Sequence, residues 1–285
     1  MNAAVIVNMT KEKALVCANK VADILLKNGA RVYAVRESAE AFEGLGVSFC
    51  VNIRELFSVC DAAVTVGGDG TIIHAAKYAA ETNTPLIGVN VGRLGFAADL
   101  ETDEIEELKR IITGDFTIDR RMLLDVEVQK PEGLQSYLAV NDAVVAHGQF
   151  SKIVDFSLML GNEEIARYRA DGILFSTPTG STAYSLSAGG PIVSPQIDCI
   201  LMTPVCPHSL FSRSVLFEGS SRLSVAVKIP QGCSCLLTVD GEVNVDIAEG
   251  DRVSIKKSQL SLELISLKKR NFYLKLNKKL KEREL

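Results

Sequence analysis

Three glycines surround one carboxylate in the segment Gly67-Gly68-Asp69-Gly70-Thr71, which follows the apolar run 62–66. Glycine lets another molecule approach the backbone closely, and the stretch 72–80 has a helical pattern whose first N–H groups would face an anion such as phosphate. A carboxylate beside bound phosphate repels it unless a metal ion or a proton-transfer role compensates. The segment therefore predicts either a phosphate site with Asp69 as a base or a plain helix cap by Asp69 or Thr71, and the motif alone does not choose between them.

A second group of polar side chains fills the segment 171–191, where a strand pattern leads into serines, threonines and small residues. Hydroxyls both donate and accept hydrogen bonds, and Tyr184 adds a flat apolar face. This set of side chains suits a ribose and a base better than a metal ion. The alternative is a Ser/Thr-rich turn that joins two elements.

Two shorter acid-bearing pairs follow strand-like runs. Asn141-Asp142 follows residues 137–140, and its two side chains could hold two vicinal hydroxyls. Asp240-Gly241 follows residues 236–239, and a hairpin turn is the favoured interpretation there. The three histidines are isolated in sequence, and the seven cysteines form no CxxC pair, so we predict no metal site built from protein ligands.

Strands that alternate with helices must position the glycine segment. Apolar patterns predict strands over 3–7, 31–35, 62–66 and 85–89, and helices over 13–28, 53–59, 72–80 and 101–112. This order is typical of a parallel sheet covered by helices on both faces, which binds ligands at the carboxyl ends of its strands. A second glycine loop, from Asn90 to Phe96, falls at the same edge.

Beyond residue 116 the pattern becomes β-rich. Short β-branched runs predict strands over 126–128, 143–145, 153–160, 173–176, 223–229, 235–239 and 252–255. We expect an α/β domain with a parallel sheet over residues 1–115 and a β-rich, sandwich-like domain over 116–267. Residues 268–285 are basic with interleaved apolar side chains, which favours a segment that packs back on one of the domains.

The composition excludes several classes of protein. With 47% hydrophobic and 23% charged residues and a net charge of −4, the 285-residue chain is typical of a globular protein and gives no reason to expect nucleic acid as a partner. No apolar run approaches the roughly 18 residues of a membrane span, and the apolar start is too short for a signal peptide, so we expect a cytoplasmic location. The sequence has no P-loop, no complete dinucleotide fingerprint and no GxSxG motif.

Together these motifs resemble those of the NAD kinase family, and the resemblance covers most of the chain. The segment 67–71, the second glycine loop, the pair Asn141-Asp142 and the segment 171–191 each look like a motif of that family. The Gly-Gly-Asp-Gly loop alone is shared with diacylglycerol kinases, sphingosine kinases and phosphofructokinases. The long segment 171–191 makes the resemblance specific.

The resemblance implies transfer of the terminal phosphoryl group of ATP to the adenosine ribose 2′-hydroxyl of NAD, which gives NADP. Asp69 would take the proton of that hydroxyl, and Gly68, Gly70 and Thr71 would contact the nucleotide. Because the loop contains no lysine, its N–H groups and a Mg²⁺ or other divalent cation carried by the donor phosphates would offset the charge. Polyphosphate stays open as an alternative donor.

The resemblance also implies which residues hold NAD. Asn141 and Asp142 would bind hydroxyls of the nicotinamide-side ribose, although Asp142 stands where glutamate is commoner in the family. Phe96 would approach the adenine, and Asp171 would reach the nicotinamide end, often across a subunit contact. The remaining residues of the NAD site would be Thr179, Thr182, Ala183, Tyr184 and Ser187. The family architecture implies a homo-oligomer, either dimer or tetramer, and a C-terminal stretch that returns to the first domain.

Two alternative functions would need different parts of these motifs. A lipid kinase of the diacylglycerol type would keep the first glycine loop without needing the segment 171–191. A catalytically silent NAD-sensing module would gain nothing from Asp69, because pure binding does not need a base beside phosphate.

Overall fold

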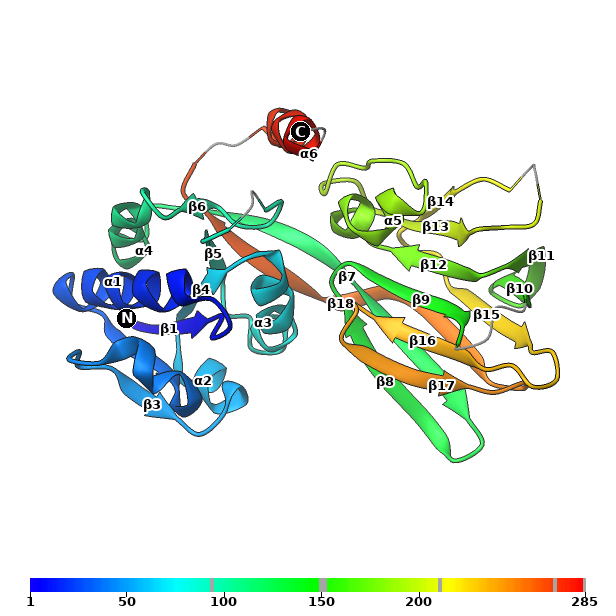
Figure 1. Ribbon diagram of the computed structural model, residues 1–285, viewed down its shortest axis with the longest axis horizontal. Coiled ribbons are helices and arrows are strands. Elements are labelled where there is room, and N and C mark those ends of the chain that lie inside the picture. Colours follow the sequence, from blue (N-terminus) through cyan, green and yellow to red (C-terminus); the bar gives the residue numbers. More distant parts are fainter. Residues whose placement is uncertain (93–94, 149–152, 210–211, 269–270, 284–285) are drawn as a thin grey trace. The chain divides into compact units, whose positions relative to one another are not determined.

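The computed structural model describes residues 1–92, 95–148, 153–209, 212–268 and 271–283 (Figure 1). The chain forms two compact units, an α/β unit of Met1–Arg120 and Leu262–Leu285, and a β unit of Arg121–Ser261. The strands β7 (Thr117–Lys130) and β18 (Arg252–Ser266) each begin in one unit and end in the other. The unit boundaries therefore fall inside strands, whereas the sequence-based division places them at residues 115 and 267, just outside these strands.

The α/β unit is built on a sheet whose described strand pairings are all parallel. The central order is β3-β2-β1-β4-β5, and the end of β18 pairs with β5 at Leu264 and Leu86. The strands are β1 (Asn2–Val7), β2 (Arg31–Val35), β3 (Ser48–Cys50), β4 (Ala62–Gly67), β5 (Leu86–Asn90) and the short β6 (Leu100–Glu101), which pairs with β5. This confirms the predicted α/β domain with a parallel sheet.

Helices cover both faces of this sheet. Every residue of β4 and β5 is buried, and successive side chains of a strand point to opposite faces, so both faces must be covered. Val64 and Val66 share one hydrophobic core with α1 (Glu12–Lys27), η1 (Arg36–Phe42), η2 (Ile105–Leu108) and α4 (Lys109–Thr113). On the other face, a Cβ on Gly88 would collide with Ile72 of α3 (Asp69–Thr82), so the glycine permits close packing of this helix. The remaining helices of the unit are α2 (Ile53–Val59) and the C-terminal α6 (Phe272–Arg283).

The prediction of one helix over 101–112 is wrong. Glu101 pairs with Asn90 in β6, and a turn closed by the hydrogen bond from Glu104 N–H to the Glu101 carbonyl separates it from η2 and α4. The backbone of Glu101 is therefore committed to the sheet. The helical part ends at Gly114, which adopts the left-handed conformation that glycine allows.

The β unit is a sandwich of antiparallel strands, which confirms the second part of the fold prediction. One sheet has the order β14-β13-β12-β9-β16-β17, and its side chains share a core with those of β7, β10, β15 and the first half of β18. The strands not yet given are β8 (Gly133–Ala139), β9 (Asp142–His147), β10 (Val154–Leu160), β11 (Glu163–Ala170), β12 (Gly172–Ser176), β13 (Cys199–Val205), β14 (Val215–Glu218), β15 (Leu223–Lys228), β16 (Cys235–Val239) and β17 (Val243–Ile247). Two short helical turns, η3 (Thr179–Thr182) and α5 (Tyr184–Ser187), follow β12.

Candidate functional site

The first glycine loop leads directly into α3. The helix begins at Asp69 itself, and its N-cap is Gly68, which has no side chain to cap it. The hydroxyl of Thr71 is buried and has no hydrogen-bond partner among the described residues. Neither Asp69 nor Thr71 is therefore a helix cap, and the N–H groups of Asp69 and Gly70 have no acceptor within the helix.

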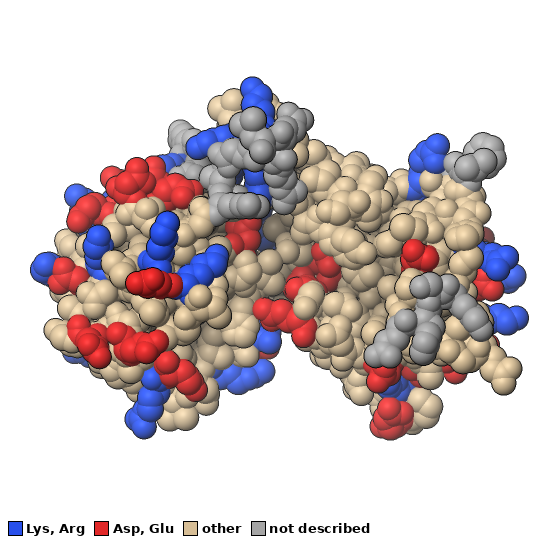
Figure 2. Space-filling view, viewed as in Figure 1, with Lys and Arg blue, Asp and Glu red and all other residues tan. Residues whose placement is uncertain are grey.

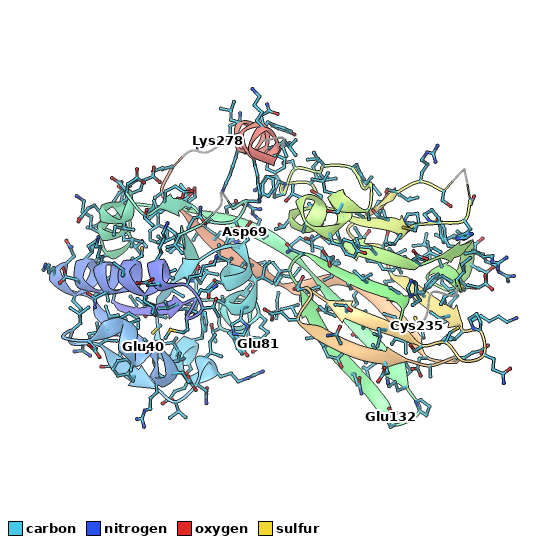
Figure 3. The ribbon with its side chains drawn as sticks, in the orientation of Figure 1. Glu40, Asp69, Glu81, Glu132, Cys235 and Lys278 are labelled. Atoms are coloured by element: carbon cyan, nitrogen blue, oxygen red, sulfur yellow. The ribbon has the colours of Figure 1, made fainter. Side chains whose placement is uncertain are left out.

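Asp69 instead holds the second glycine loop. One carboxylate oxygen accepts the N–H of Phe96 at 2.7 Å, and the other accepts the N–H of Ala97 at 3.0 Å. The fit is close, because a Cβ on Gly95 would collide with the Asp69 carboxylate. Figure 3 labels Asp69 at the start of α3. The structure thus brings together three predicted site residues, Gly68, Asp69 and Phe96, at the carboxyl ends of β4 and β5.

Helix α6 adds two lysines to this place in the α/β unit. The Nζ atom of Lys279 lies 3.6 Å from a carboxylate oxygen of Asp69 and 3.7 Å from the centre of the Phe96 ring. Lys275 donates to the carbonyls of Phe96 and Ala98, both at 2.7 Å. These contacts dock the C-terminal segment on the α/β unit, whereas Lys278, labelled in Figure 3, is exposed.

A pocket of about 520 Å³ in the β unit contains four of the predicted NAD-binding residues, Asn141, Asp142, Ala183 and Tyr184. The first two stand at the start of β9, and the other two at the start of α5. Side chains from β9 and from the β16–β17 hairpin complete the lining, namely Val144, Ala146, Thr238, Asp240 and Gly241. Tyr184 is 46% exposed and lines this pocket, so its aromatic side chain is accessible to a ligand there.

Asp240 fixes the backbone beside this pocket. It has a positive φ of 50°, as has Gly241 with 73°, and the two residues form the predicted hairpin turn. The Asp240 carboxylate accepts the N–H groups of Val140, Asn141 and Asp142 at 2.7 to 3.0 Å. Burial raises the pKa of Asp240, while these three hydrogen bonds lower it. Burial is the larger effect, so the pKa of Asp240 lies above its ordinary value, and the three N–H donors oppose this rise because they favour the ionised form.

Asp142 is the second buried carboxyl group at this pocket. Burial and then the nearby Asp240 carboxylate raise the pKa of Asp142 to about 7, against a smaller opposing effect of the Tyr184 N–H. A carboxyl group that titrates near neutral pH can either donate to or accept from a hydroxyl group. Asp142 therefore suits a ligand with vicinal hydroxyls, such as a ribose.

Most hydroxyls of the segment 171–191 bond to the protein. The Thr177 hydroxyl donates to the Val140 carbonyl at 2.7 Å and accepts the N–H of Gly180, while the Ser181 hydroxyl donates to the Pro178 carbonyl and accepts the N–H of Val193. A Cβ on Gly180 would collide with the backbone of Asn141. The segment therefore has a structural role as well, because it holds Asn141 and Tyr184 at the same pocket.

The other predicted residues of this segment do not line the pocket. Thr182 is buried and bonds to the Thr179 carbonyl, and the Thr179 hydroxyl accepts from Arg121 at 3.4 Å. Ser187 is exposed at the end of α5. Asp171 precedes β12, and its carboxylate lies 3.8 Å from Nε2 of His147, at the opposite end of the β9–β12 pair from Asp142.

Sequence reasoning missed several residues of both sites. Lys275 and Lys279 lie far along the chain from Asp69, and Thr238 and Asp240 lie about 100 positions from Asn141, so only the fold brings them together.

Acidic and basic side chains are interspersed over the face of the molecule drawn in Figure 2. In the part of the chain that the structure describes, no helix is long and apolar enough to cross a membrane.

Known proteins resemble this chain both in sequence and in structure. Sequence models of the ATP-NAD kinase N-terminal and C-terminal domains match residues 3–116 and 140–267. A NAD kinase of Natranaerobius thermophilus is 35% identical over 277 residues, which make up 96% of this chain and 95% of that protein. A NAD kinase of Desulforamulus reducens is 38% identical over 234 residues, which make up 81% of each chain.

Two solved structures are similar over nearly the whole chain. The crystal structure of yeast NADH kinase complexed with NADH has a TM-score of 0.91 and 25% identity, and it covers 98% of this chain and 87% of that one. The crystal structure of a NAD kinase from Archaeoglobus fulgidus in complex with ATP has a TM-score of 0.77 and 25% identity over 99% of both chains. The chain belongs to the ATP-NAD kinase family.

Proposed function

We propose that this chain transfers the terminal phosphoryl group of ATP to the adenosine ribose 2′-hydroxyl of NAD, giving NADP and ADP. Its family and its relatives are phosphotransferases named NAD kinase. The observation that carries the proposal is the pocket in the β unit, where Asn141, Asp142 and Tyr184 gather beside Asp240. A diacylglycerol-type lipid kinase would not need this ribose-binding set.

Asp69 takes the proton of the acceptor hydroxyl. In the reaction a bond forms between the ribose oxygen and the γ-phosphorus, the bond from that phosphorus to the β-phosphate oxygen breaks, and ADP leaves with the electron pair. Each oxygen of Asp69 accepts one backbone N–H and keeps a second lone pair, so the carboxylate can still accept the hydroxyl proton. The two N–H groups also fix the orientation of the carboxylate.

The divalent cation arrives on the donor phosphates. The described residues include no group of three or more His, Cys, Asp or Glu side chains that could hold a metal ion. Asp69, which is the acidic side chain of the glycine loop, already has two N–H donors and Lys279 as partners. Mg²⁺ bound to the donor would offset the phosphate charge without needing a protein carboxylate.

The remaining residues have the roles that the family resemblance implies. Gly68, Gly70 and Thr71 contact the nucleotide, Phe96 approaches the adenine, and Asn141 with Asp142 holds the nicotinamide-side ribose. The resemblance also places Thr179, Thr182 and Ser187 in the NAD site, and η3 and α5 carry them next to Ala183 and Tyr184 in the chain. Asp171 is 42% exposed beside His147, and this exposure fits a contact with NAD bound to a second copy in a dimer or tetramer. The cytoplasmic location stays a prediction.

The proposal is tested with purified protein, ATP, Mg²⁺ and NAD, with NADP read through an NADP-specific dehydrogenase. Asp69→Asn should lose roughly 100-fold or more in turnover, the effect of removing a general base, while NAD binding is retained. The matched control is Asp23→Asn, which changes a partly exposed aspartate of α1 that pairs with Lys27. No NADP from the wild-type protein at any concentration would refute the proposed function. Near-wild-type turnover of Asp69→Asn would remove Asp69 from the role of base.

A further inference from the structure

The loop between β1 and α1 brings a lysine to both glycine loops of the α/β unit. A Cβ built on Gly92 would lie 3.4 Å from the Nζ atom of Lys11, and one built on Gly68 would lie 3.9 Å from the same atom. The ammonium group therefore lies against the backbone of the first loop and of the second. Both positions are glycine, so no side chain at either position stands between Nζ and the loop backbone.

The backbone that carries Lys11 is well fixed. The N–H of Asn8 donates to the carbonyl of Val66 at 3.0 Å, which ties the loop to the end of β4. The Asn8 side chain accepts both the N–H and the hydroxyl of Thr10, and the Lys11 N–H donates to the Asn8 carbonyl. Lys11 is then the N-cap residue of α1. Its side chain consequently starts from a defined point beside the glycine loop.

Lys11 differs in its partners from the other lysines of this site. Lys275 is bonded to two carbonyls, and Lys279 is paired with Asp69. Within the described ranges, by contrast, the ammonium of Lys11 has no hydrogen bond or ion pair with the protein. It also stands near the N-terminal end of α3, where the helix dipole adds partial positive charge. An ammonium placed there without a protein partner fits a ligand with several negative charges.

We propose that Lys11 binds the phosphate chain of the nucleotide donor. This inference rests on the proposed function, because the donor is the triphosphate of that reaction. The segment Gly67-Gly68-Asp69-Gly70-Thr71 contains no lysine, although phosphoryl transfer requires cations along the donor phosphates. Lys11 supplies from the preceding loop the charge that P-loop enzymes place inside their phosphate loop.

The test compares Lys11→Met with Lys13→Met, which removes an exposed lysine two residues further along the chain. Calorimetry measures binding of ATP with Mg²⁺, and separately of inorganic tripolyphosphate, in the absence of NAD. Loss of one charge-assisted contact should weaken both about 10- to 100-fold in Lys11→Met and leave Lys13→Met unchanged. The KM for ATP should rise similarly while the KM for NAD stays constant, and Lys11→Arg should restore most of the affinity.

The outcomes separate this inference from the proposed function. If the wild type binds ATP but makes no NADP, and Lys11→Met weakens that binding, the proposed function fails and the role of Lys11 stands. If both proteins make NADP with equal affinity for ATP and tripolyphosphate, the function stands and the role of Lys11 is refuted. An equal loss in Lys13→Met would also refute it, because the effect would then come from general surface charge.

Discussion

Replacing Asp142 by asparagine should stabilise the protein at pH 8 and much less at pH 5. Asp142 is 6% exposed and lies near the Asp240 carboxyl group, and burial followed by this neighbour raises the pKa of Asp142 to about 7. In the unfolded chain the same carboxyl group ionises near its ordinary value of 3.8. Asparagine resembles the protonated form in shape and cannot ionise, so the variant avoids the cost of a buried charge.

The sign and size follow from proton linkage. Between about pH 4 and 7 the folded protein keeps a proton on Asp142 that the unfolded chain has released, so stability falls as the pH rises by about 1.4 kcal/mol per unit. Above pH 7 both states are ionised and the contribution is constant. Between pH 5 and pH 8 the wild type should therefore lose on the order of 3 kcal/mol relative to the variant. For a protein of this size, the gap in melting temperature between Asp142→Asn and the wild type should therefore widen by roughly 5 °C from pH 5 to pH 8.

The assay is thermal unfolding of wild type and Asp142→Asn at pH 5, 6, 7 and 8 without NAD. Asp246→Asn is the matched control, because Asp246 is an exposed aspartate on β17 of the same unit. The difference between Asp142→Asn and wild type should grow up to pH 7 and then stay level, while the control shows no trend. A difference that is equal at pH 5 and pH 8 would refute a protonated Asp142 in the folded protein.

Two further substitutions probe contacts that hold the sites. Gly180→Ala should lower the free energy of unfolding by about 1–3 kcal/mol and weaken NAD binding, because its Cβ would press on the backbone of Asn141. Gly46→Ala adds a Cβ in open space and should change neither quantity. An unchanged melting temperature and NAD affinity in Gly180→Ala would contradict this packing. Lys279→Met should raise the amide exchange of α6 on the order of 10-fold, because it removes both the ion pair with Asp69 and the contact with the Phe96 ring. The exposed Lys278→Met is its control, and equal exchange in the two variants would show that Lys279 does not dock the helix.

The parts of the fold that the sequence predicted are those with a strong local pattern. The runs 31–35 and 53–59 became β2 and α2 with those bounds, and 235–239 became β16. The two strands are short, mainly apolar runs, and the helix begins after Asn52, whose side chain caps it. The charged edge strand β11 gave no such pattern and was missed, because only Ala170 of its eight residues is buried and the strand therefore has no apolar pattern to recognise. The long β18 was recognised only over 252–255, since its second half serves a different unit.

The site residues that the sequence predicted are those that belong to a continuous motif. The family assigned from the segments 67–71 and 171–191 is the one to which the chain belongs, and Asn141, Asp142, Ala183 and Tyr184 do share a pocket. Asp240 was read as a turn, which it is, but its carboxylate also holds three N–H groups at the pocket wall. A turn motif carries no information about such long-range bonds, so this second role could not be predicted.

The surroundings of Asp69 show why the motif alone could not decide whether this residue is a catalytic base or a helix cap. The sequence raised a conflict between a carboxylate and bound phosphate, and the family resemblance resolved it with the N–H groups of the loop and a metal ion on the donor phosphates. The structure adds three nearer partners, namely two backbone N–H groups and the ammonium of Lys279, which compensate the charge of Asp69 before any nucleotide binds. The carboxylate can therefore stand beside phosphate without opposing it at full strength. The same bonds hold the second glycine loop, so Asp69→Ala would remove a base and a structural contact together, and Asp69→Asn is the substitution that comes nearer to separating them.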